Sequence, residues 1–336
     1  MANHMIPPAT APDFLARVGW AGADIRPLAG DASFRRYFRV HLGDRQAVLM
    51  DAPPPHEDPR PFIFIANLLR DRGFSAPEIL GVDLAAGLVL LEDFGDDLVR
   101  PVIERAPERE RAIYETACDL LSALARTPAP ADVAPYDDAV MLREVNLFPE
   151  WYAPATGLAV DVEDFAAAWR ACWAGVEQVA QRERVLVLRD YHAENMLMVD
   201  RPGLRQLGLL DFQDALAGHA AYDLVSLLQD ARRDVDPALE AAMLDHYMAS
   251  NAIADEAEFR AHYAVLGAQR NTKILGIFTR LWQRDGKAGY LAYQPRVWAY
   301  LDRDLAHPAL APVKAWFDAH VPVNARAAHW IKDRVA

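Results

Sequence analysis

Residues 189–214 restrict the possible folds of this chain most strongly. They read R-D-Y-H-A-E-N-M-L-M-V-D, a short connector, and then L-G-L-L-D-F-Q-D. An apolar segment at 185–188 (V-L-V-L) comes directly before them and is typical of a buried strand. Residues 196–199 and 206–210 predict two further short strands, with R-P-G at 201–203 as the turn. We therefore expect a strand, a loop and a hairpin that returns the chain to the loop.

Three polar side chains occur in the predicted loop and at the end of the hairpin that follows it. Asp190 and Asn195 lie five residues apart in the predicted loop, and Asp211 follows sixteen residues after Asn195, at the end of an apolar run. The first acid can take a proton from a hydroxyl, while the amide and the second acid can hold Mg²⁺ against the phosphates of a nucleotide. For a single aspartate, a solvated acid is the more common explanation. The combined spacing favours phosphoryl transfer.

The composition is that of an ordinary globular protein. The chain has 336 residues, of which 52% are hydrophobic and 25% charged, so one or two domains with a large core are expected. A net charge of −13 argues against nucleic acid and anionic membrane surfaces as partners, and it permits a cationic substrate without requiring one. No apolar run approaches the roughly 20 residues of a membrane span and no signal-peptide pattern is present, so we expect a cytoplasmic protein.

The first third of the chain predicts strands, and the remainder predicts helices. Alternating residues at 37–42 and 46–51 predict a hairpin that follows a G-D-A-S turn. Two further strands are expected at 76–80 and 88–93, with a helix at 58–72 before them. After Phe94 the pattern changes to amphipathic helices, which are predicted at 107–126, at 162–182 and over a long segment near 255–284.

The stretch that begins at Arg189 resembles the catalytic and metal-binding loops of the aminoglycoside phosphotransferase and choline kinase-like family, which are small-molecule relatives of the protein kinases. The usual signature of that family is H-G-D-x-x-x-x-N, followed by a strand and I-D-F/W. Here Leu188-Arg189-Asp190 stands where His-Gly-Asp is usual. The resemblance implies an α+β, two-lobed protein-kinase-like fold. A small β-rich nucleotide-binding lobe is expected at residues 1–93, and a large helical lobe with the catalytic loop and sugar site at 94–336.

The resemblance also implies a set of site residues and the cofactors Mg²⁺ and ATP. Asp190 and Arg189 are the expected catalytic residues, Asn195 and Asp211 the metal ligands, and Asp223 a support for the catalytic loop. The nucleotide contacts are expected at Ser33, Phe34, Arg35, Met50, Leu91, Glu92, Asp93 and Phe94. The substrate contacts are expected at Glu144, His192, Gln213 and Asp190.

The segment that contains Glu144 reads R-E-V-N-L-F-P-E-W-Y at 143–152. Mixed aromatic and polar side chains suit a sugar, because sugars need hydrogen-bond partners for their hydroxyls and an aromatic face for their C–H patches. Core packing of Phe148, Trp151 and Tyr152 explains the same letters equally well.

One position departs from the family pattern. Relatives place a lysine on the strand that here reads A-V-L-M-D, where it holds two phosphates of the nucleotide, whereas the first lysine of this chain is Lys273. Met50 or a neighbour takes that position. The nearest candidate cations are Arg35, Arg36 and Arg39, since arginine brings both charge and a forked set of donors suited to phosphate. All three also fit a role as solvated strand residues. Glu57 is the candidate for the acid that usually pairs with the missing lysine.

Motifs along most of the chain, among them G-D-A-S-F-R-R-Y-F-R, R-D-Y-H-A-E-N and R-N-T-K-I-L-G-I-F-T-R-L, resemble one branch of this family. That branch contains sugar kinases of bacterial cell-wall recycling, which phosphorylate N-acetylmuramate and N-acetylglucosamine at C1 and supply a downstream nucleotidyltransferase. An aminoglycoside, choline or homoserine phosphotransferase is the first alternative. A nucleotide-binding pseudokinase scaffold, motivated by the missing lysine, is the second. The sequence does not identify the basic group expected near the anionic sugar.

Overall fold

The computed structural model describes residues 6–28 and 34–327, which form two compact units. Unit 1 holds the described residues up to Glu108 together with Ala193–Asp214, and unit 2 holds Arg109–His192 together with the described residues from Ala215 onward. This division differs from the predicted boundary at 93/94. The hairpin segment joins unit 1 because its backbone bonds there: the N–H of Leu209 donates to the carbonyl of Ser75 at 2.7 Å, and that of Met198 donates to Asp97 at 2.8 Å.

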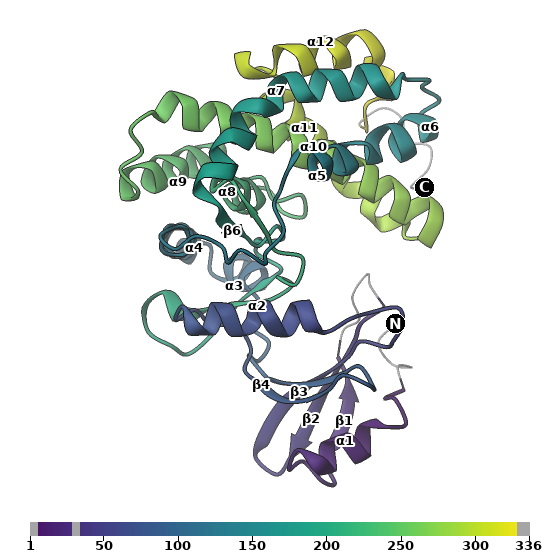
Figure 1. Cartoon of the computed structure of the whole chain (residues 1–336), viewed down its shortest axis with the longest axis vertical. Coiled ribbons are helices and arrows are strands. Elements are labelled where there is room, and N and C mark those ends of the chain that lie inside the picture. The colour runs from purple at the N-terminus through teal and green to yellow at the C-terminus, as the bar shows by residue number, and fades with distance from the viewer. Residues whose placement is uncertain (1–5, 29–33, 328–336) are drawn as a thin grey trace. The chain divides into compact units, whose positions relative to one another are not determined.

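Unit 1 is built on a five-stranded antiparallel sheet (Figure 1). The strand order is β1-β2-β3-β5-β4, with bounds β1 Asp24–Pro27, β2 Arg36–Leu42, β3 Arg45–Asp51, β4 Ile79–Asp83 and β5 Leu88–Glu92. The predicted hairpin is confirmed, and it places Tyr37 opposite Met50. Strand β1 was not predicted. It is only four residues long and mostly exposed, so its sequence carries little hydrophobic pattern.

The two faces of this sheet have different neighbours. Helix α1 (Ala11–Arg17) packs on one face, where Phe14, Leu15 and Trp20 form a core with alternate strand residues such as Phe38 and Leu49. Successive side chains on a strand point to opposite faces. The intervening residues of β2 and β3 therefore face away from α1.

The remaining elements of unit 1 hold the segment before Asp214. The predicted hairpin is present as β7 (Met196–Met198) paired with β8 (Leu207–Leu209), with η4 (Gly203–Gln206) between them. Helix α2 (Arg60–Asp71) confirms the prediction for 58–72, and its Phe62 stacks on Phe212 with ring centroids 5.0 Å apart. Helix α3 (Val99–Arg105) and the turn η2 (Pro107–Arg109) complete this part of the chain.

Unit 2 is predominantly helical. Its helices are α4 Glu110–Ala125, α5 Asp138–Val145, α6 Ala153–Ala155, α7 Val162–Glu183, α8 Ala221–Leu228, α9 Pro237–Ser250, α10 Glu256–Asp285, α11 Gln294–Leu305 and α12 Ala311–His320. Strands β6 (Val185–Val187) and β9 (Leu216–Gly218) pair, and short helical turns occur at η3 Phe148–Tyr152, η5 Ala288–Tyr293, η6 Pro308–Leu310 and η7 Val323–Ala325. The predicted helices at 107–126 and 162–182 are confirmed.

Helix α10 is the centre of unit 2 and contacts α5, α7, α8 and α11 (Figure 1). Every residue from 262 to 276 in it is buried. A helix buried on all sides is normally apolar, yet this segment carries Arg270 and Lys273. Both cations therefore need partners inside the protein.

An aromatic cluster forms the core beside η3. Phe148 and Tyr152 are fully buried, and the indole N–H of Trp298 donates to the Tyr152 hydroxyl at 2.8 Å. Trp151 is only half-buried. Within residues 6–28 and 34–327, no helix combines the length and the apolar character needed to cross a membrane.

Candidate active site

The loop that follows β6 is held from behind by Asp223 on α8. The Asp223 carboxylate accepts the N–H of Leu188 at 2.7 Å and the N–H of Arg189 at 2.9 Å. Burial raises the pKa of Asp223 to about 7, and the two amide donors act in the opposite direction. Asp223 therefore fixes the backbone at Leu188 and Arg189, and its expected role in supporting catalysis remains a prediction.

Arg189 has a backbone conformation that glycine adopts more easily, with φ = 70°. A side chain in this region costs about 1–2 kcal/mol. Its environment offsets that strain, because its N–H bonds to Asp223 and its carbonyl accepts a hydrogen bond of 2.7 Å from Arg270. Its guanidinium bonds to Glu144. This conformation also explains why glycine is usual at this position in the family that the sequence resembles.

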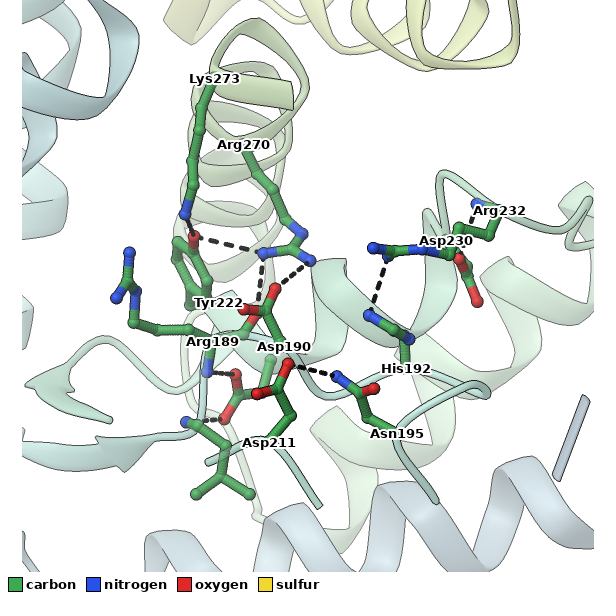
Figure 2. A network of polar contacts seen from close by, with 12 residues as sticks. Arg189, Asp190, His192, Asn195, Asp211, Tyr222, Asp230, Arg232, Arg270 and Lys273 are labelled. Atoms are coloured by element: carbon green, nitrogen blue, oxygen red, sulfur yellow. Dashed lines mark hydrogen bonds and ion pairs between the residues drawn. The ribbon is translucent and has the colours of Figure 1, made fainter. Parts of the chain in front are cut away.

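Asp190 lies among cations of its own unit (Figure 2). One Nη of Arg270 is 3.3 Å from Oδ1 of Asp190, and Figure 2 shows that guanidinium pointing from α10 toward the loop. Burial opposes ionisation of Asp190, but Arg270, Lys273, His192 and Arg189 together bring its pKa below the ordinary range. Asp190 is therefore an ionised carboxylate and a weak base at neutral pH.

Glu144 joins the catalytic loop to α10. It is 4% exposed, and its oxygens accept hydrogen bonds from Lys273 at 2.8 Å, from Gln269 at 3.0 Å, and from Tyr136 and Arg189. Burial opposes its ionisation, yet Lys273 and Arg189 lower its pKa to about 2. We expected Glu144 to contact the sugar. In the structure its carboxylate is an internal counter-ion with four protein donors, and a sugar contact by Glu144 remains a prediction.

His192 is buried in unit 2 and 3% exposed. An Nη of Arg232 lies 3.0 Å from its Nε2, as Figure 2 shows. Burial lowers the pKa of His192, so a neutral imidazole that accepts at Nε2 is favoured at neutral pH. A substrate contact by His192 remains a prediction.

The hairpin in unit 1 brings Asn195 and Asp211 together. The Asn195 amide donates to Oδ2 of Asp211 at 3.3 Å, and the N–H of Leu210 donates to the Asn195 carbonyl at 2.9 Å. Gln213, a predicted substrate contact, donates to Oδ1 of Asp211 at 2.8 Å. Asp211 itself has φ = 58°, an uncommon conformation for a residue with a side chain.

These residues fit a Mg²⁺ ion that is shared with phosphates. Mg²⁺ is usually bound by one or two carboxylates, with substrate phosphates and water as its other ligands. Asp211 would supply a carboxylate oxygen and Asn195 its amide oxygen, since the two ends of an amide group exchange by rotation. No cluster of three or more His, Cys, Asp or Glu ligands occurs among the described residues.

The three candidate arginines have different surroundings. Arg35 is 9% exposed, and its guanidinium lies 3.6 Å from Oδ1 of Asp211 and 3.7 Å from Oε2 of Glu57. Arg36 bonds to Asp51 across the hairpin at 2.8 Å. Arg39 pairs with Asp93, so it ties β2 to the residues after β5. Of these three arginines, Arg35 is the one that lies next to Asp211, the expected metal ligand.

A pocket of about 390 Å³ lies in unit 1. Leu91, Glu92, Asp93 and Phe94, four of the expected nucleotide contacts, line it together with Asn195 and Asp211. Apolar residues on the same wall include Val48, Phe62, Leu197 and Leu210. Such a wall suits the flat faces of a nucleotide base.

Two other expected nucleotide contacts, Met50 and Phe34, do not line this pocket. Met50 is fully buried in the sheet and is not among the described residues that line the pocket. Phe34 is 65% exposed and stacks on His56 instead of facing the pocket. Ser33 lies outside the described residues.

Residues 24–262 match the sequence profile of the phosphotransferase enzyme family. The chain belongs to this phosphotransferase enzyme family. An N-acetylmuramate/N-acetylglucosamine kinase of Caulobacter vibrioides is 39% identical, over 93% of this chain and 96% of its own length. A protein of the same name from Pseudomonas aeruginosa is 38% identical, over 89% and 90% of the two chains.

Solved structures support the expected fold class. A choline/ethanolamine kinase family protein from Mesorhizobium loti superposes with a TM-score of 0.61 at 16% identity, over 91% of this chain and 97% of its own. At that identity the likeness shows the fold alone. The predicted α+β, protein-kinase-like class is confirmed, with strands in unit 1 and mostly helices in unit 2.

Sequence reasoning assigned no role to Arg270, Lys273, Gln269 or Tyr136, although they surround Asp190 and Glu144. The available signal was a pair of charged residues at 270 and 273, within a short polar segment between two mainly apolar runs at 263–268 and 274–278 of one long helix. Charges at such positions are rarely buried unless they are paired.

Proposed function

We propose that this phosphotransferase transfers the γ-phosphoryl group of ATP to the anomeric hydroxyl of N-acetylmuramate and N-acetylglucosamine. The names of the two kinase relatives support the acceptor, since both match most of the chain at 38–39% identity. The observation that carries the proposal is the carboxylate of Asp190, which Arg270 and its neighbours keep ionised.

The weak basicity of Asp190 makes the acidity of the acceptor hydroxyl important. An anomeric hydroxyl is more acidic than an ordinary alcohol, because the ring oxygen withdraws electron density from C1. A general base works best when its pKa lies near the operating pH, so a weakly basic Asp190 loses less efficiency with an acidic acceptor hydroxyl than with an ordinary alcohol. We propose that Asp190 orients this hydroxyl and accepts its proton as the new P–O bond forms and the bond to the leaving phosphate oxygen breaks.

The residues of unit 1 would bind the nucleotide. We propose that the base lies in the pocket at residues 91–94 and that Arg35 contacts the phosphates in place of the missing lysine. Glu57 would orient Arg35 by ion pairing. Asp211 and Asn195 would hold Mg²⁺, which neutralises phosphate charge during transfer when it is bound. The remaining catalysis comes from positioning and charge stabilisation by the protein.

The test offers ATP and Mg²⁺ together with N-acetylglucosamine, N-acetylmuramate, choline, homoserine or kanamycin, and locates the phosphate by ³¹P–¹H correlation. We expect phosphate on C1 of both sugars. Phosphate on an aminoglycoside, choline or homoserine hydroxyl, with none at C1 of the sugars, would overturn the proposal. Transfer to another sugar hydroxyl would overturn only the anomeric assignment.

The Asp190→Asn variant separates an active kinase from a nucleotide-binding scaffold. We expect its kcat to fall by about 10²–10⁴, the usual contribution of a general base. Its affinity for ATP should be unchanged, because the proposed nucleotide contacts are in unit 1. A wild-type protein that binds ATP and transfers no phosphate would favour the scaffold.

If the kinase is active, we propose that it acts in the cytoplasm and that its sugar 1-phosphate product is used by a nucleotidyltransferase.

A further inference from the structure

Arg280 on α10 differs from the other cations of that helix. Arg270 pairs with Asp190 and Lys273 with Glu144, whereas no hydrogen bond or ion pair joins Arg280 to another described residue. Its side chain is partly buried, and its Nε is shielded from solvent without a partner. Burial and the neighbouring Arg284 both lower the pKa of Arg280, while Asp285 and Glu150 oppose them. A guanidinium in this condition is suited to an added anion.

Contacts along α10 show which segment Arg280 faces. Glu144 bonds to Lys273, and a methyl group added at Gly276 would lie 2.3 Å from the carbonyl oxygen of Leu147. One turn further on, Glu150 contributes to the electrostatics of Arg280. The segment 144–150 therefore runs alongside 273–280 in the same direction. Figure 1 shows α5, where this segment begins, next to α10.

Other side chains in segments 144–151 and 273–280 also offer groups that a ligand can contact. The Oδ1 atom of Asn146 is buried without a hydrogen-bond partner among the described residues. Trp151 and Ile277 are partly exposed, although their neighbours Tyr152 and Gly276 are buried. A hydrogen-bonding amide, an aromatic face and a free cation are the groups that an acidic amino sugar needs.

We propose that Arg280 binds the carboxylate of N-acetylmuramate and so adds affinity for the acidic sugar over N-acetylglucosamine. This proposal rests on the proposed sugar kinase function. Arg280 follows Lys273 by seven residues, or about 10.5 Å along the helix axis, and helical side chains lean toward the N-terminus of their helix. We therefore expect the Arg280 side chain to extend toward the Lys273–Glu144 pair.

N-acetylmuramate carries a second group that a cation can bind. In N-acetylmuramate the carboxylate is carried on an ether arm at C3, several bonds away from the anomeric hydroxyl. An enzyme that holds both ends needs a base at one end of the sugar and a cation at the other. N-acetylglucosamine has no such arm, so it does not use the cation.

The test measures KM and kcat of the Arg280→Gln variant with both sugars. We expect KM for N-acetylmuramate to rise about 10- to 100-fold, the range for loss of a charged hydrogen bond, and kcat/KM for N-acetylglucosamine to stay within about twofold. Arg280→Lys should recover part of the loss. Arg284→Gln is the matched control, because Arg284 is exposed, pairs with Asp285 and lies one turn further along α10.

A second measurement does not depend on a stable variant. The methyl ester of N-acetylmuramate lacks the charge, and the wild-type enzyme should handle it as Arg280→Gln handles the acid. Equal losses with both sugars, or an unchanged KM for N-acetylmuramate, would overturn the role of Arg280. A wild-type enzyme that phosphorylates neither sugar would overturn the proposed function itself.

Discussion

The buried charges near Asp190 form ion pairs. Each partner compensates for the hydration that the charged group loses on burial. Glu144, Arg189, Arg270 and Lys273 are all largely buried. Breaking a buried pair costs about 3–5 kcal/mol, although such a pair contributes little net stability compared with an apolar alternative. We therefore infer that these ion pairs serve mainly to position the loop at residues 188–190, and that they add little to the stability of the fold.

Glu144 should make stability depend on pH. Its folded-state pKa of about 2 lies below the ordinary 4.5, so the folded protein binds this proton less readily than the unfolded chain. The contribution is complete above about pH 5 and is lost as pH falls toward 2. We expect Glu144→Gln to lower Tm at pH 7, and the two proteins to converge as pH falls toward 2. Thermal unfolding followed by circular dichroism measures both. Glu150→Gln, at an exposed position, is the control, and a constant difference in Tm would contradict the assignment.

Arg35 should determine affinity for the nucleotide. Loss of a hydrogen bond to a charged group costs about 1.5–3 kcal/mol, so KM for ATP should rise by about 10- to 100-fold in Arg35→Gln. Arg35→Lys should retain more affinity. Steady-state kinetics with ATP as the varied substrate provides the measurement. Arg36→Gln, which loses the pair with Asp51 and the hydrogen bond to the Ile6 carbonyl, should leave KM unchanged. A larger effect in Arg36→Gln would move the phosphate contact to that residue.

Helix α10 positions the acceptor side of the proposed site through a close contact with the chain after α5. Gly276 permits this approach, since an added Cβ would lie 2.4 Å from the carbonyl carbon of Leu147 as well as 2.3 Å from its oxygen. Tight helix packing of this kind keeps the spacing of Glu144, Asn146 and Arg280 along the two segments.

The Gly276→Ala variant tests this packing. In an exposed helix the change would stabilise by about 0.5–1 kcal/mol. Here we expect destabilisation of about 1–3 kcal/mol from overpacking, and a lower Tm. Gly289→Ala is the control, because an added Cβ there meets nothing within 4 Å. Equal Tm values for Gly276→Ala and the wild type would contradict the close approach.

At the level of the whole molecule, the nucleotide pocket and the Asp190 environment belong to different units. The pocket is lined by residues of unit 1, whereas Asp190, Arg270 and residues 273–280 of α10 are in unit 2. Each unit has its own core, so ligands should stabilise the two units selectively.

Amide hydrogen exchange can separate the two binding events. A non-hydrolysable ATP analogue with Mg²⁺ should protect residues 88–98 and 195–211, and N-acetylmuramate should protect 144–151 and 273–284. N-acetylglucosamine should protect the second set less at its C-terminal end, near Arg280. Choline serves as the negative control. Protection of unit 1 alone by either sugar would contradict the assignment of the acceptor to unit 2.

Local sequence was enough to predict the loop after β6, the hairpin that returns Asp211 to Asn195, and the hairpin of β2 and β3. These features depend on strand periodicity and on turn residues, which act over a few positions. Asp190, Asn195 and Asp211 could be named for the same reason, since short stretches of sequence carry both their spacing and their chemistry.

Long-range contacts decided the rest. Glu144 and Lys273 are 129 residues apart in sequence, and Arg270 and Asp190 are 80 apart. No local pattern shows that Glu144 is buried under four donors, or that Arg35 and not its neighbours lies beside Asp211. The ionisation of a buried group depends on the charges that packing brings around it. Tertiary structure therefore decided which side chains surround Asp190, and which cation on α10 has no partner among the described residues.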